Sequence, residues 1–214
     1  MINSLTAPSV ARTLDRMHGE ADKELPKILK GLSKGLFRKL QPEDMADTYI
    51  AMNREQGRLM YQLIRSAGAR HIVEFGTSFG ISTLYLAAAA RDNGGQVITT
   101  ELLPEKAATA LNNFEEAGLA DHIDLRVGDA LETLQNVAPG IEFLLLDGWN
   151  DLYLPLLRLL QPRFAPTATI ITDNAGMSSA KPLLDYIKSH PNYLSTPLKT
   201  SKGITEYSLY LQSA

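Results

Sequence analysis

The feature that most constrains the fold is a regular alternation of short apolar runs and amphipathic segments from residue 54 onward. The apolar runs, such as FLLL at 143–146, are continuous, which is typical of strands buried on both faces of a sheet. A strand–helix succession of this kind predicts a parallel sheet covered by helices on both faces. Helices are expected at 54–67, 81–91, 104–117, 131–137, 152–160 and 181–189, and strands at 72–75, 96–100, 123–127, 141–147 and 167–173.

The end of the chain departs from this alternation. The segments YLSTPLK and ITEYSLYLQ are separated only by TSKG, which is too short for a helical crossover. They should therefore pair as an antiparallel hairpin. With the five preceding strands, this predicts an α/β fold with a seven-stranded, mostly parallel sheet. A reversed last strand resembles the topology of S-adenosylmethionine-dependent methyltransferases, whereas an ordinary dinucleotide-binding fold ends with parallel strands.

The composition narrows the class of protein. The chain has 214 residues, which suits one globular domain with an appendage, and its net charge of −3 disfavours nucleic acid or an anionic membrane as partner. Cysteine is absent, which excludes disulfides and thiolate metal sites. No apolar segment is long enough for a signal peptide core or a membrane span. We expect a soluble, cytoplasmic protein.

The N-terminal part is expected to be a separate helical extension at 1–48, followed by the main domain at 49–214. Leu25, Ile28, Leu29 and Leu32 form a stripe at helical spacing that needs a cover. The extension should therefore act as a lid over the site or form a homodimer.

The turn VEFGTSFGIST at 73–83 is the first candidate for ligand binding. In an open parallel sheet, ligands bind beyond the carboxyl ends of the strands. Gly76 and Gly80 bracket the turn after the first strand, where backbone must approach a ligand closely. Ser78, Ser82 and Thr83 lie around the next helix N-terminus, whose free N–H groups favour an anion such as a carboxylate.

Two further strand ends carry acids. Glu101 ends the strand VITTE, where a carboxylate can accept hydrogen bonds from both hydroxyls of a ribose. Asp129, in VGDA, can take an adenine amino group. The alternatives are a helix N-terminal acid for Glu101 and a helix cap for Asp129. Together the three strand ends indicate an adenosine ligand.

The chemical centre is predicted from FLLLDGWNDLY and IITDN. Asp147, Asp173 and Asn174 each follow a buried strand, so their side chains should share one rim if the strands are neighbours. Two carboxylates and an amide carbonyl are hard oxygen ligands, suited to Mg²⁺. Without a cation the two acids would repel and raise one pKa. The alternative is independent helix capping by each residue.

The motifs AMNREQGRLM, VEFGTSFGISTLYLA, ITTELLPEKAATA, LLLDGWNDLYLP and IITDN, followed by KGITEYSLY, resemble the cation-dependent O-methyltransferases, which include catechol and caffeoyl-coenzyme A O-methyltransferases. The resemblance runs from about residue 51 to 210 and implies a Rossmann-like class I methyltransferase fold, S-adenosylmethionine as cofactor and a divalent cation such as Mg²⁺. The residues implied for the methionine part of the cofactor are Met52, Glu74, Gly76 and Ser82. Those implied for its ribose and adenine are Glu101, Leu102, Asp129 and Ala130. Those implied for the metal are Asp147, Asp173 and Asn174, with Trp149 at the substrate mouth. Asp147 also borders the cofactor, and Asp147 and Glu206 are the expected catalytic residues.

The chain departs from the family pattern at two positions. Asn150 stands where catechol-type members have the lysine that removes the phenolic proton, and an amide cannot take that proton at neutral pH. Gly148 lacks an imidazole that some relatives place against adenine. Either the metal alone acidifies the substrate hydroxyl, or Asp151 or Glu206 is the base, or the substrate is not a catechol.

The expected activity is methylation of a hydroxyl on a small, catechol-like aromatic substrate. Three alternatives remain. The first is methylation of a hydroxylated nucleoside in tRNA, for which the lysines at 27–39 could supply a basic patch. The second is an NAD-dependent oxidoreductase, against which the spacing in GTSFG and the hairpin both argue. The third is a non-catalytic cofactor-binding relative.

Overall fold

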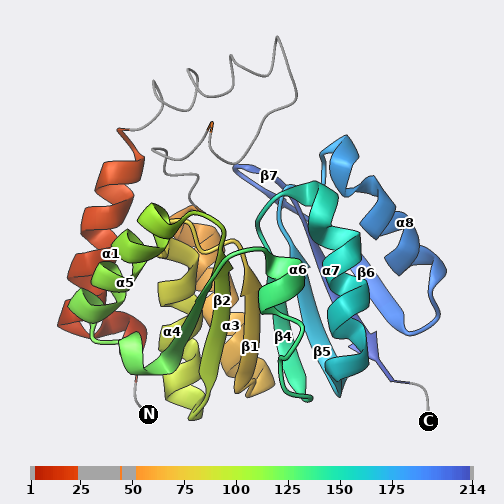
Figure 1. The fold of residues 1–214 in the computed structure, drawn as a ribbon, viewed down its shortest axis with the longest axis horizontal. Coiled ribbons are helices and arrows are strands. Elements are labelled where there is room, and N and C mark those ends of the chain that lie inside the picture. The colour runs from red at the N-terminus through yellow and green to blue at the C-terminus, as the bar shows by residue number, and fades with distance from the viewer. Residues whose placement is uncertain (1–2, 24–43, 45–51, 213–214) are drawn as a thin grey trace.

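The structure is a computed structural model that describes residues 3–23, 44 and 52–212. Its centre is a seven-stranded sheet in the order β3-β2-β1-β4-β5-β7-β6 (Figure 1). Neighbouring strands from β3 to β5 are parallel, and β7 is antiparallel to both β5 and β6. The strands are β1 (His71–Phe75), β2 (Gln96–Glu101), β3 (Ile123–Val127), β4 (Ile141–Leu146), β5 (Phe164–Thr172), β6 (Tyr193–Thr200) and β7 (Gly203–Leu211). This confirms the predicted mostly parallel sheet with its terminal hairpin.

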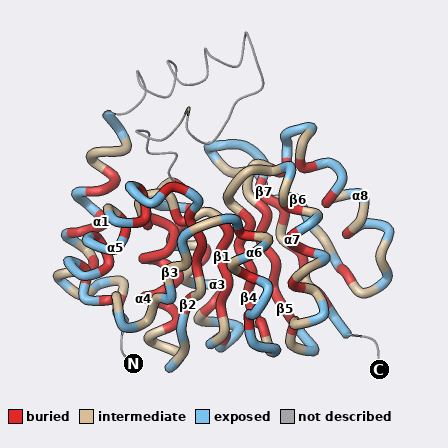
Figure 2. The backbone as a smooth tube through the Cα atoms, viewed as in Figure 1, coloured by how far each residue is buried: buried red, intermediate tan, exposed pale blue. Residues whose placement is uncertain are grey.

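Helices cover both faces of the sheet. They are α1 (Pro8–Ala21), α3 (Arg54–Ala67), α4 (Ile81–Asn93), α5 (Pro104–Ala117), α6 (Ala130–Thr133), α7 (Tyr153–Leu160) and α8 (Lys181–Ser189). Residues of α1, α3, α4 and α5 form one apolar cluster with alternate strand residues such as Leu145 and Ile171. Residues of α6, α7 and α8 form a second cluster with the intervening positions, Leu144 and Ile170. Figure 2 shows the buried chain concentrated in the strands and the helix sides that face them.

Most predicted elements have bounds close to those of the structure, and α3, α5, β3 and α8 have the same ones. The exception is the helix expected at 131–137, because α6 ends at Thr133 and the chain turns, with the Val137 N–H donating to the Leu134 carbonyl. None of the described helices is long and apolar enough to cross a membrane.

The central helix α4 is buried on every side along residues 81–90. A helix that is apolar all round requires cover on all sides, and α1 supplies part of it, with Val10, Leu14 and Met17 in the same cluster as α4. The described part of the N-terminal segment therefore belongs to the core of the main domain. The apolar stripe at residues 25–32, on which the lid or dimer expectation rests, lies outside the described residues.

Candidate functional site

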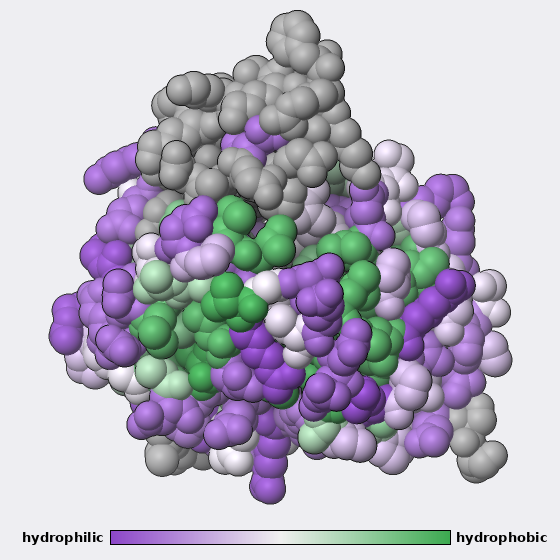
Figure 3. All heavy atoms as spheres, in the orientation of Figure 1, coloured by the Kyte–Doolittle hydropathy of each residue, from purple (hydrophilic) through white to green (hydrophobic). Residues whose placement is uncertain are grey.

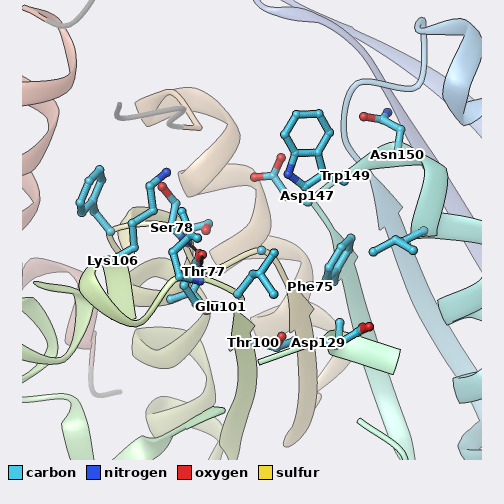
Figure 4. A pocket seen from close by; sticks show the side chains of 18 of the residues that line it. Phe75, Thr77, Ser78, Thr100, Glu101, Lys106, Asp129, Asp147, Trp149 and Asn150 are labelled. Atoms are coloured by element: carbon cyan, nitrogen blue, oxygen red, sulfur yellow. Dashed lines mark hydrogen bonds between the residues drawn. The ribbon is translucent and has the colours of Figure 1, made fainter. Parts of the chain in front are cut away.

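A cavity of about 350 Å³ lies beyond the carboxyl ends of the central strands, within the volume range usual for small-molecule sites. The winding of the sheet reverses between β1 and β4, and the cavity lies at this point, as expected for an open α/β sheet. Figure 4 shows Ser78 and Lys106 toward one end of the cavity and Trp149 and Asn150 toward the other. Predicted site residues that line it are Met52, Gly76, Ser82, Glu101, Leu102, Asp129, Ala130, Asp147, Trp149 and Asn174.

Gly76 and Gly80 both lie in the turn between β1 and α4. At each position, contacts within the protein explain why a residue with a side chain would not fit. Gly76 has a φ of 105°, and a Cβ there would lie 2.8 Å from the backbone of Asp147. At Gly80, with a φ of 93°, a Cβ would lie 2.4 Å from the ring of Phe114. The glycine at 76 thus lets the ends of β1 and β4 come together, which brings Asp147 to the cavity wall.

Glu74 lies beneath the cavity rather than in its lining. Its Oε2 accepts hydrogen bonds from the hydroxyls of Thr83 (2.5 Å) and Thr99 (2.6 Å), so it joins α4, β1 and β2. Burial raises the pKa of Glu74, against the effect of the hydroxyls of Ser82, Thr83 and Thr99. Oε1 has no donor in hydrogen-bond geometry among the described residues.

Glu101 is held by two backbone donors at the end of β2. Its Oε2 accepts from the Ser78 N–H (2.8 Å) and its Oε1 from the Leu103 N–H (2.9 Å). Each oxygen keeps a free lone pair, so the carboxylate can both fix the turn and accept hydrogen bonds from a ligand. The neighbouring Leu102 side chain is 44% exposed at the rim.

Asp129 follows β3 and caps α6, because its side chain accepts a hydrogen bond from the Leu131 N–H at 2.8 Å. One side-chain oxygen of Asp129 therefore has the helix-capping role that the sequence allowed as an alternative. The residue still lines the cavity together with Ala130. Capping and ligand binding are compatible for a carboxylate, which has two oxygens.

Asp147 and Asp173 come together at the ends of adjacent strands. β4 pairs with β5 through Leu146 and Thr172, the residues before the two acids, and the two carboxyl groups are near enough for the charge of Asp173 to act on Asp147. The pKa of Asp147 is raised well above its usual value, first by burial and then by the charges of Asp173 and Glu74. The predicted metal site required these two strands to be neighbours, and they are.

Asn174 completes this group from the next position of the chain. Its φ of 54° lies in the left-handed region, which asparagine tolerates better than most residues. Burial and then the charges of Asp147 and Asp173 raise the pKa of the Tyr153 hydroxyl, against the effect of the Asn174 side chain. The hydroxyl donates to the Gly148 carbonyl at 3.2 Å. A buried tyrosine thus lies beside the amide and the two acids.

Comparisons with known proteins show which proteins this chain resembles. A model described as a methyltransferase domain matches residues 73–175. The chain is 29% identical over 209 residues to a catechol O-methyltransferase of Mycobacterium tuberculosis, covering 90% of this chain and 94% of that protein. It is 30% identical to a catechol O-methyltransferase of Niastella koreensis over 129 residues, 58% of either chain.

Solved structures agree with this. The cofactor-bound protein Rv0187 from MTB superposes with a TM-score of 0.70 at 26% identity, over 91% of this chain and 95% of that one. An O-methyltransferase from Bacillus cereus in complex with SAH has the same fold, with a TM-score of 0.70 at 24% identity over 91% and 96% of the two chains. The chain is an S-adenosylmethionine-dependent O-methyltransferase similar to the catechol O-methyltransferases.

Within this O-methyltransferase, Glu206 does not lie where the sequence prediction put it. It is 1% exposed, accepts a hydrogen bond from the Ser195 hydroxyl (2.6 Å), and is not among the described residues that line the cavity. Side chains alternate along a strand, and its predecessor Thr205 is the residue that faces the site, donating to Asp173 Oδ1 at 2.9 Å. The assignment of Glu206 as catalytic is corrected on this ground.

Asn150 of the methyltransferase lines the cavity and supports the turn that carries Asn174. Its Nδ2 donates to the Asn174 carbonyl at 3.4 Å. Gly148 is also explained locally, since a Cβ there would lie 2.5 Å from the ring of Phe75. Asp151, the adjacent candidate base, is exposed and is not among the described lining residues.

Several lining residues of the methyltransferase were not predicted, and Lys106 is the most informative. Its side chain is buried, with Nζ 5.1 Å from the centroid of the Phe79 ring, at the cavity wall. The sequence could have indicated this position, because Lys106 lies at helical spacing from the apolar residues Ala110 and Phe114. A lysine in an apolar stripe indicates either an ion pair or a site. Phe75, Thr77 and Thr100 also line the cavity without having been assigned a ligand.

Proposed function

We propose that this enzyme methylates a hydroxyl group of a small, catechol-like aromatic substrate held by Mg²⁺ or a similar divalent cation. The observation that carries the proposal is the pair of adjacent carboxyl groups, Asp147 and Asp173, beside a cavity that belongs to an S-adenosylmethionine-dependent O-methyltransferase. Two adjacent oxygens of a catechol would complete the coordination of a cation that such a pair holds.

The chemistry of the side chains fits a cation. Asp147, Asp173 and Asn174 offer only oxygen ligands, which Mg²⁺ prefers. Burial and the charges of Asp173 and Glu74 oppose ionisation of Asp147, and a divalent charge at this point would reverse that balance. When bound, the cation would act as a Lewis acid that lowers the pKa of a coordinated hydroxyl.

The remaining lining residues fit the cofactor. Its sulfonium supplies an electrophilic methyl group. Glu101, rigidly held by two N–H donors, is suited to the ribose hydroxyls, with Leu102, Asp129 and Ala130 around the adenine. Met52, Gly76 and Ser82 would border the methionine part, with Glu74 beneath them. Trp149 would form an aromatic wall against the substrate ring.

The proton of the substrate hydroxyl is proposed to leave without a lysine base. Asn150 cannot accept it, Asp151 is exposed, and Glu206 lies on the other face of the sheet. The contribution of the protein is then alignment of the oxygen with the methyl group, worth roughly 7–11 kcal/mol in favourable cases.

The net charge of the chain and the small volume of the cavity favour a small molecule over nucleic acid as partner, and we propose a cytoplasmic location. A homodimer stays a prediction that rests on residues 25–32.

The cation is tested by titration calorimetry and by turnover. Wild type should bind S-adenosylhomocysteine and should methylate catechol only in the presence of Mg²⁺. Asp147→Ala should retain cofactor binding within about threefold but lose at least about 100-fold in turnover, as expected when a metal-site group is removed. Asp185→Ala, which removes an exposed carboxylate on α8, is the control. Turnover of wild type that survives removal of divalent cations by chelation would contradict the proposal.

The missing base is tested by Asp151→Asn. A general base contributes about 10²–10⁴-fold to rate, so a loss smaller than about tenfold is expected if no side chain at this turn takes the proton. A loss of about 10³-fold, with an altered pH profile, would instead assign the base to Asp151.

A further inference from the structure

Asp173 is held from one side by two buried donors that belong to other elements. Its Oδ1 accepts a hydrogen bond from Gln56 Nε2 (3.1 Å), on α3, and another from Thr205 Oγ1 (2.9 Å), on β7. Gln56 is 3% exposed and Thr205 2% exposed. Because Oδ1 already accepts from two donors, Oδ2 is the oxygen left available to a cation.

The orientation of the Gln56 amide follows from its partners. Its Oε1 accepts a hydrogen bond from the Asn53 backbone N–H (3.2 Å), which can only donate. The amide nitrogen must therefore point toward Asp173, whose Oδ1 accepts its hydrogen bond. Both ends of the amide are matched, so the side chain has a single satisfied orientation.

The same residue closes the N-terminus of α3. The Gln56 N–H donates to Asn53 Oδ1 (2.8 Å), which with the bond above forms a reciprocal capping box. Asn53 Nδ2 also donates to Ser201 Oγ (2.8 Å) at the tip of the β6–β7 hairpin. Gln56 thus stands where the start of α3, the end of β5 and the hairpin meet.

We propose that Gln56 is a positioning residue that fixes Asp173 through Oδ1, so that Oδ2 is presented to the divalent cation, with Thr205 as the second holder. This rests on the proposed cation site and goes beyond it by assigning roles to two residues outside the ligand set. Hydrogen bonds that orient metal ligands typically change metal affinity by 10–100-fold. An ordinary helix cap would have no such effect.

The test is a titration of the apo enzyme with Mn²⁺ alone, followed by electron paramagnetic resonance. Gln56→Met keeps the length of the side chain and removes the hydrogen bonds of the amide to the Asn53 N–H, to Asp173 Oδ1 and to Thr205 Oγ1. We expect its Kd for Mn²⁺ to rise at least about tenfold. Thr205→Val, which removes one donor at nearly constant volume, should raise the Kd in the same direction.

Asn53→Ala is the matched control, because it breaks the other half of the capping box and leaves the Gln56–Asp173 bond available. It should lower thermal stability about as much as Gln56→Met, while its Kd for Mn²⁺ stays within about threefold of wild type. Equal weakening in Asn53→Ala and Gln56→Met would overturn the positioning role. So would an unchanged Kd in Gln56→Met when wild type binds Mn²⁺, and that result would leave the proposed function standing. Absence of Mn²⁺ binding by wild type would overturn both.

Discussion

At the scale of single residues, two helical glycines are surrounded very differently. Gly57 on α3 lies against the Tyr85 ring, so a Cβ there would stand 2.4 Å from it, whereas nothing lies within 4 Å of a Cβ at Gly19 on α1. Gly→Ala in a helix normally stabilises by roughly 0.5–1 kcal/mol, and overpacking a core costs roughly 1–3 kcal/mol. Gly19→Ala should therefore stabilise and Gly57→Ala destabilise. Urea unfolding of both variants measures this, and a stabilised Gly57→Ala would show that Tyr85 moves freely.

Single residues also show how much of the site could be predicted from the sequence. Asp147 and Asp173 could be predicted because each directly follows a strand, and parallel strands end at one edge. Glu206 was misplaced because a shift of one position along a strand moves a side chain to the opposite face. Gln56 could not have been found from its own surroundings. Its sequence neighbourhood indicates only a helix cap, and its contact with Asp173 spans 117 positions.

At the scale of elements, local periodicity was enough to place the strands and most helices, and the reversed hairpin followed from loop length. Local patterns could not predict the packing of α1, because the sequence of α1 does not indicate that it packs against α4. The segment before α1 is fixed to the middle of α3 and to the C-terminal end of α4. The Asp92 carboxylate accepts hydrogen bonds from the Ser4 N–H (2.9 Å), from the Ser4 hydroxyl, and from the Tyr61 hydroxyl (2.6 Å).

Asp92→Ala tests whether this contact holds α1 on the core. A hydrogen bond to a charged group contributes roughly 1.5–3 kcal/mol to stability. We therefore expect Asp92→Ala to lower the free energy of unfolding by about that amount. Amide hydrogen exchange in α1 should accelerate more than in β4. Asp185→Ala, which removes an exposed i,i+4 ion pair on α8, should cost no more than about 0.5 kcal/mol. Unchanged exchange in α1 would show that its apolar face alone holds it.

At the scale of the whole molecule, the contact between α1 and α4 makes stability depend on pH. His18 is 4% exposed, and its Nε2 lies 3.0 Å from the Tyr85 hydroxyl. Burial, followed by the charge of Arg54, lowers the pKa of His18 to about 4, with Lys202 acting in the same direction and Asp15 and Asp22 opposing it. The face that α1 packs against the core therefore contains His18, and its burial favours the neutral imidazole over the protonated one.

The sign of the pH effect follows from proton binding. Between the unfolded pKa of about 6.5 and the folded pKa of about 4, the unfolded chain binds more protons at His18, so the free energy of unfolding falls as pH falls. The loss should approach about 3 kcal/mol at the acid end of this window. Urea unfolding of wild type and His18→Gln at several pH values from about 7.5 to about 4.5 measures it. Glutamine keeps a hydrogen-bonding group for Tyr85 and does not titrate, so the variant should lose less stability over this range. Other acid-sensitive groups contribute equally to both proteins, and parallel pH profiles would show that α1 releases His18 to solvent before the molecule unfolds.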